Sequence, residues 1–332
     1  RWRLLLTEAA EADPAVASEA KYRWAGFLRG QFGVETMQRW GYGRFFGGHS
    51  PPDGKEDESG TFELHTLSEE ETIARLATGV KRISLPNEHN HIVVLRQIAE
   101  MRDKGHSEAA LNDLASIFEN RRQYPAAAKL WRESIRRFGP GNNSWKVRRL
   151  DQIVDNWGRF DGSQAHPAGE KPSLGFVFRN GEEVSFEAHA IDVPALLEDI
   201  KDYLEDNPRE VDSHRINIAN LGYELVNERM KKYVGKKVAE WELRLEPREN
   251  HWDRRIDVAT PMTAAGAYLL RAKMEDGNTS NIVVWVADTA IVKKPLANRS
   301  FYFIADAVDG SPISKANVEF FGFRYEYLDR KK

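Results

Sequence analysis

The residue types that most often carry out catalysis are present in this chain, but not at the spacings that known chemistry requires. Ser, His and Asp all occur, yet there is no Gly-x-Ser-x-Gly elbow, Walker loop, His-Glu-x-x-His pair or dinucleotide fingerprint. The absence of Cys also excludes disulfides, thiolate metal ligands and a cysteine nucleophile within these 332 residues. We therefore predict no catalytic residue, and we predict that the chain is not an enzyme.

Four histidines in the first half of the chain are candidate metal ligands: His65, His89, His91 and His106. A neutral imidazole binds Zn²⁺ well. Loop histidines that are merely solvated are far commoner than metal ligands, so we predict neither a metal site nor a bound cofactor.

A basic stretch at residues 121–149 contains nine cations against one acid, Glu133. A phosphate-binding stripe is one interpretation. The whole chain, with 48 Lys and Arg against 51 Asp and Glu, gives no general reason to expect nucleic acid or an anionic membrane as a partner. We favour either a solvated helix face or an electrostatic contact, through Arg132 and Arg136, with an acidic cluster further along the chain. The cations are Arg121, Arg122, Lys129, Arg132, Arg136, Arg137, Lys146, Arg148 and Arg149, and the acidic cluster is Glu198, Asp199, Asp202, Glu205 and Asp206.

The elements that position these cations are predicted to be helices. Residues 1–39 and 69–158 have helical patterns, and Ser68 followed by Glu71 has the spacing of a capping box, which predicts a helix start. Between residues 107 and 140, two apolar stripes recur at helical spacing. The first is Leu111, Leu114, Ala115 and Phe118, and the second is Ala127, Leu130, Trp131 and Ser134.

This pair of stripes resembles a tetratricopeptide repeat, in which small residues such as Ala115 and Ala127 allow two antiparallel helices to approach closely. A single repeat cannot bury its own faces, so we expect a tetratricopeptide-like all-α region over residues 1–158 that forms a short solenoid. In that family the polar side of the first helix faces a groove that binds peptides. The resemblance therefore makes Asn112, Ser116 and Asn120 candidate partner-binding residues, with an ordinary polar helix face as the alternative.

Past residue 158 the pattern changes from helical to alternating. Residues 159–173 are rich in Gly, Ser and Pro and are interpreted as a linker. A β domain is expected at 174–276, beginning with a hairpin at Asn180-Gly181. A helical insert at 192–235 interrupts it, with Asp192 as the N-cap of its first helix and Ile218 and Leu225 in its second.

Three tryptophans in this half raise the question of carbohydrate binding. Trp241 and Trp285 lie among alternating apolar neighbours, which indicates core positions. Trp252, between His251 and Asp253, is the plausible exposed indole.

Three sequence elements near the C-terminus occur in a characteristic order. A segment over residues 265–270 (AGAYLL) is followed by residues 282–294 (IVVWVADTAIVKK) and then by residues 306–318 (DAVDGSPISKANV). As an ordered set they resemble the macroglobulin-type domains of bacterial alpha-2-macroglobulin-like proteins. There, a G-x-Y strand ends one domain, a V-x-D-x-x-x-V-x-K strand opens the next, and the third element makes a hairpin with it. The resemblance implies an α+β multidomain chain with antiparallel β-sandwich domains at 174–276 and, incomplete, at 280–332.

The resemblance also implies a function. It suggests the noncatalytic N-terminal scaffold of a periplasmic or secreted bacterial inhibitor that traps proteases of broad specificity, whose bait and thioester regions are absent from this chain. The partners would be proteases and further domains of its own chain. The alternative is a module that binds a peptide or an envelope protein through the helical repeats, with the β-sandwiches as spacers. No segment approaches the ~20 consecutive apolar residues of a membrane span.

Overall fold

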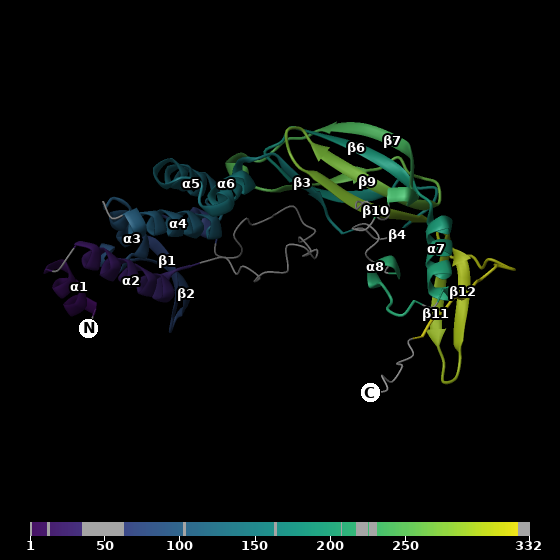
Figure 1. Cartoon of the computed structure of the whole chain (residues 1–332), viewed down its shortest axis with the longest axis horizontal. Helices are drawn as coiled ribbons and strands as arrows, with labels where there is room; N and C mark the ends of the chain where they lie inside the picture. The colour runs from purple at the N-terminus through teal and green to yellow at the C-terminus, as the bar shows by residue number, and fades with distance from the viewer. Residues whose placement is uncertain are drawn as a thin grey trace. The chain divides into compact units, whose positions relative to one another are not determined.

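A computed structural model describes residues 2–11, 14–34, 63–101, 104–162, 165–206, 208–216, 225 and 231–324. The chain forms two compact units, in which helices dominate the first and strands the second (Figure 1). Unit 1 consists of Arg1–Asp155 together with Pro247–Arg254, and unit 2 of Asn156–Glu246 together with Arg255–Lys332. The α+β class expected from the sequence is confirmed.

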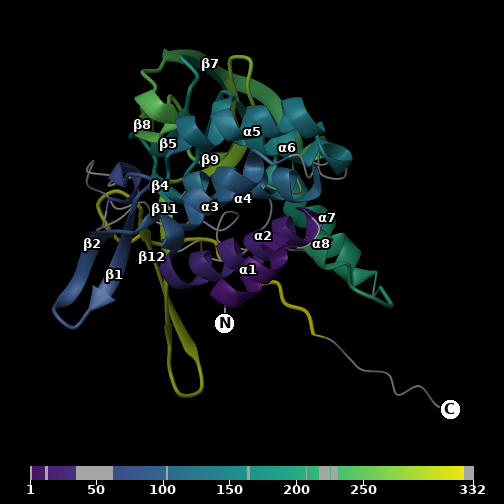
Figure 2. The ribbon, with the colours of Figure 1, turned by 90° about the vertical axis from the view of Figure 1, so that its left-hand side faces the viewer.

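Unit 1 is built mainly from helices that each pack on the next one along the chain (Figure 2). These are α1 (Trp2–Glu11), α2 (Pro14–Phe32), α3 (His91–Ala99), α4 (Lys104–Asn120), α5 (Tyr124–Phe138) and α6 (Trp145–Val154). The 3₁₀ turns of this unit are η1 (Leu64–Thr66), η2 (Asn87–His89), η3 (Asn142–Ser144) and η6 (Glu249–His251).

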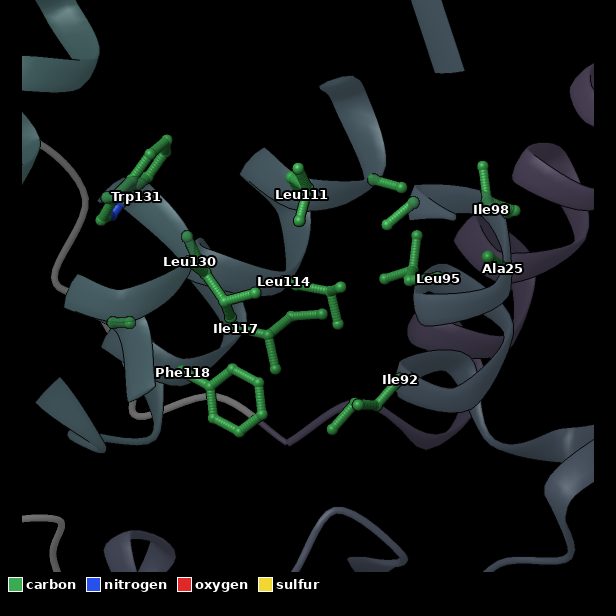
Figure 3. Close-up of a cluster of buried hydrophobic side chains, with 14 of the residues drawn as sticks. Ala25, Ile92, Leu95, Ile98, Leu111, Leu114, Ile117, Phe118, Leu130 and Trp131 are labelled. Carbon is green, nitrogen blue, oxygen red and sulfur yellow. The ribbon is translucent and has the colours of Figure 1, made fainter. Parts of the chain in front are cut away.

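The core of unit 1 lies where α3, α4 and α5 meet (Figure 3). Both predicted apolar stripes are part of it: Leu114 and Ala115 are fully buried on α4, and Ala127 and Trp131 on α5 are at most 1% exposed. Burying these stripes removes several hundred Å² of apolar surface from water, at about 25 cal/mol per Å². Hydrophobic burial therefore holds the two helices together.

The all-α region expected over 1–158 is wrong at residues 71–84, which form an antiparallel hairpin of β1 (Glu71–Leu76) and β2 (Gly79–Ser84). Half of the predicted capping box exists, because the Glu71 carboxylate accepts from the Ser68 N–H at 2.9 Å. The chain nevertheless extends after it. Thr72 and Ile73 are β-branched residues that favour a strand, and Gly79, at φ 112°, supplies the turn that returns it. The helix begins later, at His91.

Unit 2 contains a five-stranded sheet in the order β4-β10-β9-β6-β7, a three-stranded sheet in the order β3-β5-β8, and a two-stranded sheet of β11 and β12. In the five-stranded sheet, β4 and β10 are parallel and the other neighbours antiparallel. The strands are β3 (Trp157–Phe160), β4 (Ala165–Pro167), β5 (Ser173–Arg179), β6 (Glu183–Ile191), β7 (Val234–Arg244), β8 (Arg254–Ala259), β9 (Gly266–Met274), β10 (Thr279–Ala287), β11 (Thr289–Pro295) and β12 (Ser300–Asp306).

The two larger sheets share one hydrophobic core. Phe176 of β5 packs edge-to-face on Phe186 of β6, with 5.7 Å between ring centres. Phe186 in turn stacks on Trp241 of β7 at 5.0 Å, which agrees with the predicted core position of that indole. Such ring pairs add about 1 kcal/mol each beyond the burial of their area.

The predicted Asn180-Gly181 hairpin is wrong, because β5 and β6 lie in different sheets. The chain does reverse at Asn180, which has φ 62°. A Cβ on Gly181, however, would lie 2.4 Å from the Met274 methyl group. Gly181 is therefore needed because the chain passes close to Met274 as it crosses from one sheet to the other, and not because of a two-residue hairpin turn.

A helical insert lies between β6 and β7, which are neighbours in the five-stranded sheet. Asp192 caps α7 (Val193–Glu205) by accepting from the Ala195 N–H at 3.1 Å. Leu196 of α7 packs with Leu225, Tyr233 and Leu269 in a second core of this unit. The insert also contains the short α8 (Ser213–Ile216) and the 3₁₀ turn η5 (Lys231–Tyr233). Most of the predicted second helix, including Ile218, lies outside the described residues, and β7 has already begun at Val234.

The structure differs from the expected boundary at residue 280. β10 pairs with β9 from Thr279 to Val286, so it belongs to the five-stranded sheet, and the separate two-stranded sheet begins with β11 at Thr289. The chain passes from one sheet to the other at Asp288, the one residue between β10 and β11. The segment 159–173, interpreted as a linker, contains the end of β3 and all of β4.

Candidate functional site

The turn between α4 and α5 joins three separate segments of unit 1. Arg121 is fully buried, and its guanidinium donates to the carbonyls of Ser68 at 3.1 Å and Glu71 at 3.3 Å. The Gln123 side-chain amide donates to the carbonyls of His65 at 3.1 Å and Leu67 at 2.7 Å. These bonds fix the segment that leads into β1. Burial lowers the pKa of Arg121 below its usual value, because desolvation penalises the cation.

The third segment is the part of unit 1 that comes from beyond residue 246. The Trp252 indole N–H donates to the Arg122 carbonyl at 3.2 Å, and the His65 ring meets Trp252 edge-on at 5.1 Å. Arg248 lies over the same indole, 5.3 Å from the ring centre. Trp252, expected to be exposed, is therefore half-buried, and the His65 ring and the Arg248 guanidinium both contact its indole.

The sequence alone did not predict that Arg121, Gln123 and Trp252 lie together. Their bonds connect residues that are 50–130 positions apart, and the acceptors are backbone carbonyls, which no residue type reveals. The signal that remains is a run of polar residues between two helices that each carry an apolar stripe.

His91 is a second polar group inside unit 1. The Asn90 side chain caps α3 by accepting from the N–H groups of Ile92 and Val93, which places His91 in the first turn of the helix. His91 is 1% exposed, and neither ring nitrogen has a hydrogen-bond partner. Burial, together with Arg121 and Arg29 nearby, lowers its pKa to about 4. It is thus a neutral interior residue, not the solvated loop histidine expected.

The four candidate histidines lie in separate surroundings. His65 contacts Trp252, His89 lies edge-on to Trp24 at 6.3 Å, and His106 lies 5.5 Å from the Tyr22 ring. Among the residues that the structure describes, no group of three or more His, Cys, Asp or Glu could hold a metal ion.

The predicted groove residues on α4 do not form an open polar row. The Asn112 side-chain carbonyl accepts from the Ser134 hydroxyl of α5 at 2.7 Å, so Asn112 ties the two helices together. Ser116 donates to the Asn112 backbone carbonyl at 2.9 Å, and Asn120 is only 8% exposed. Their role in partner binding stays a prediction.

Arg132 and Arg136 are exposed on α5, as is Lys129 one turn before them. Four other cations of the basic stretch differ from these three because their side chains have partners. Lys146 is fully buried against Glu108 at 2.5 Å, and Arg137 donates to Glu133, the Ala99 carbonyl and Ser107. Arg149 pairs with Glu119, and Arg148 donates to the Asn143 carbonyl.

In unit 2 the characteristic C-terminal motif forms a turn after β12. The Asp306 carboxylate accepts from the N–H groups of Val308 at 2.8 Å and Asp309 at 3.2 Å, and Gly310 has φ 74°. The turn then returns along β12, where the Ile313 N–H donates to the Ile304 carbonyl at 3.0 Å. Asp and Gly at these positions have a physical role, since one caps the turn and the other takes a left-handed conformation that favours glycine.

A backbone hydrogen bond closes the open end of the β11–β12 hairpin at Asp288, the acid of the second sequence element. The Asp288 carbonyl accepts from the Ala307 N–H at 2.9 Å, and the Thr289 hydroxyl donates to the Asp288 carboxylate. On β9, the Tyr268 hydroxyl donates to the Ala264 carbonyl at 2.8 Å. Each of the three sequence elements therefore contains a polar residue with a local structural role.

No family model matches the chain, and no curated protein matches it. Solved structures that it is similar to include native alpha-2-macroglobulin from Escherichia coli spanning domains MG0-NIE-MG1, at 15% identity and a TM-score of 0.33, with 48% of each chain covered. The same protein spanning domains NIE-MG1 is similar at 14% identity and 0.31, over 48% of this chain and 74% of that one. A mutant of Salmonella alpha-2-macroglobulin is similar at 14% identity and 0.28, over 46% of this chain and 8% of that one. This chain thus spans about half of the first of these structures. No helix among the described residues is long and apolar enough to cross a membrane.

Proposed function

We propose that this chain is a noncatalytic scaffold from the N-terminal part of a bacterial alpha-2-macroglobulin-like protein that traps proteases in the periplasm or outside the cell. The observation that carries the proposal is the ordered set of three motifs at residues 265–318. Their polar residues, Tyr268, Asp288 and Asp306, each take part in a local hydrogen bond.

The surface of β11–β12 supports further domains of the same chain as partners. Val292 is 56% exposed and Phe301 is 55% exposed, although both are large apolar side chains. A two-stranded sheet is at best marginally stable by itself. Packing against additional strands would bury these side chains, as a macroglobulin-type sandwich does.

The test uses the whole natural protein and trypsin. A trapped protease keeps its active site but loses access to large substrates. We expect the rate of casein cleavage to fall by roughly tenfold or more. Hydrolysis of a small chromogenic peptide should continue at nearly its normal rate.

Heat-denatured protein is the control, since it competes as a substrate but cannot enclose a protease. Equal loss of casein and peptide cleavage would indicate an active-site inhibitor instead. If casein were cleaved at the normal rate after preincubation, the trapping proposal would be wrong.

A second candidate is a module that binds a peptide or protein partner through its helical region. The exposed side chains of Arg132 and Arg136 favour it, whereas the internal bonds of Asn112 and the burial of Asn120 do not. In that case the β domains would act as spacers, and the helical unit would carry the specificity.

A further inference from the structure

Three cations on α5 have no partner within the described residues of unit 1. We call Lys129, Arg132 and Arg136 the α5 cation row. All three are exposed, and none makes an ion pair, hydrogen bond or ring contact. This separates them from Arg137, Lys146 and Arg149 on α5 and α6, which are held by carboxylates.

The row is rigidly presented. Residues spaced by three and by seven positions lie on one side of a helix, so the three side chains follow each other over about 10 Å of the helix axis. The opposite side of α5 is fixed in the core by Ala127, Ala128 and Trp131, each at most 1% exposed. The helix cannot rotate to redistribute these charges.

Helix stability does not explain the row. Cations near a helix C-terminus interact favourably with the helix dipole, which accounts for Arg136 and Arg137 in the last turn. Lys129 and Arg132 lie further back, where this effect is weak, and like charges at such spacing repel one another. A bound acidic group would relieve that repulsion.

We propose that the α5 cation row is a docking surface for an acidic segment of a partner protein, which binds with carboxylates matched to the row. A helix with acids at i, i+4 and i+7 places its charges about 5–6 Å apart, which fits the spacing on α5. This inference develops the second candidate function and does not depend on protease trapping.

An acidic polypeptide fits better than a nucleic acid or a membrane. The chain has a net charge of −3, so there is no broad positive field to attract a densely charged polymer. The row is one helix wide, and the residues beside it, exposed Pro125 and half-buried Glu133, do not provide the apolar side chains that a membrane-bound helix buries. A short complementary row of carboxylates matches both its width and its charge.

The experiment measures binding of a fluorescein-labelled Ala/Glu helical peptide, with Glu at i, i+4 and i+7, to the whole chain by fluorescence anisotropy. Replacing the row (Lys129→Glu, Arg132→Glu, Arg136→Glu) should weaken binding by roughly tenfold or more. A matched variant, Lys81→Glu, Lys171→Glu and Lys236→Glu, changes the net charge equally at exposed cations elsewhere and should bind within about twofold of the natural chain.

Circular dichroism verifies that both variants keep their helices. Equal weakening by the two variants would show general charge attraction and overturn the proposal, as would the absence of any binding to the natural chain. Tighter, row-dependent binding of a single-stranded oligonucleotide or of phosphatidylserine vesicles would reassign the surface to that partner. Row-dependent self-association in sedimentation would identify a second copy as the occupant instead.

Discussion

His91 shows how a single interior residue makes unit 1 sensitive to pH. Both ring nitrogens lack partners, and the charged groups that act on the ring, Arg121 and Arg29, are both cationic. Protonation of the folded state is therefore costly, while the unfolded chain accepts a proton at the ordinary pKa of about 6.5.

We expect the stability of unit 1 to be highest above pH 6.5 and to fall as the pH decreases toward 4. The pKa of His91 is lowered to about 4 in the folded state, so between these values only the unfolded state binds the proton. The loss should reach up to about 3 kcal/mol and then level off below pH 4. Urea unfolding followed by far-UV circular dichroism at several pH values measures it.

His91→Leu is the matched comparison, because it fills the same site without a titratable group. The variant should lose most of the slope between pH 6.5 and 4 and keep about the same stability at pH 7. An unchanged slope would show that other groups cause the acid sensitivity.

At the scale of elements, buried hydrogen bonds from the α4–α5 turn hold the segment that leads into β1. Arg121→Met keeps the apolar volume but removes the buried guanidinium that donates to the carbonyls of Ser68 and Glu71. We expect a loss of about 1–3 kcal/mol in the free energy of unfolding of unit 1. Arg122→Met, next to it on the exposed surface, should change stability by less than about 0.5 kcal/mol.

Hydrogen exchange of the β1–β2 amides provides an independent measurement for this pair of variants. Arg121→Met should accelerate exchange there, since it releases the segment that leads into β1, while Arg122→Met should not. Similar exchange in both variants would mean that the buried guanidinium does not hold the hairpin.

The elements also show what sequence patterns can and cannot predict. The helical stripes around Ala115 and Trp131 were predictable because burial of one face repeats every three to four residues. The strand at Glu71 was not, because the carboxylate of a capping box satisfies the Ser68 N–H equally well in a turn that leads to a strand. Asn180-Gly181 was misleading for a different reason, since Gly181 is required by a close approach to Met274 and not by a hairpin.

At the scale of the molecule, the least predictable feature is the membership of residues 247–254. They lie between β7 and β8 in sequence, yet they belong to unit 1. They are bound to unit 1 by a hydrogen bond from the Trp252 indole N–H to the Arg122 carbonyl, 130 positions away in sequence. Alternation and composition report only local neighbours, so neither could reveal this. The candidate surface on α5 was half predicted, because Arg132 and Arg136 stood out by charge, while the lack of partners required the fold.

The outer edge of β7 has a consequence for the solubility of the protein. Within the described residues, no strand pairs with this edge, and it offers an 11-residue row of backbone donors and acceptors to any other strand. Charged side chains occupy it at Lys236, Lys237, Glu240, Glu242 and Arg244, which keeps copies of the chain apart.

Lys236→Val with Glu242→Val should therefore make the protein aggregate by edge-to-edge pairing, seen as light scattering that grows with concentration. Glu170→Val with Lys171→Val removes the same two charges from an exposed loop and should leave the solution clear. If both variants scatter equally, the charges act through overall solubility rather than at this edge. If only the β7 variant scatters, the charges along β7 are what allows a long open strand to exist in a crowded compartment without joining a fibre.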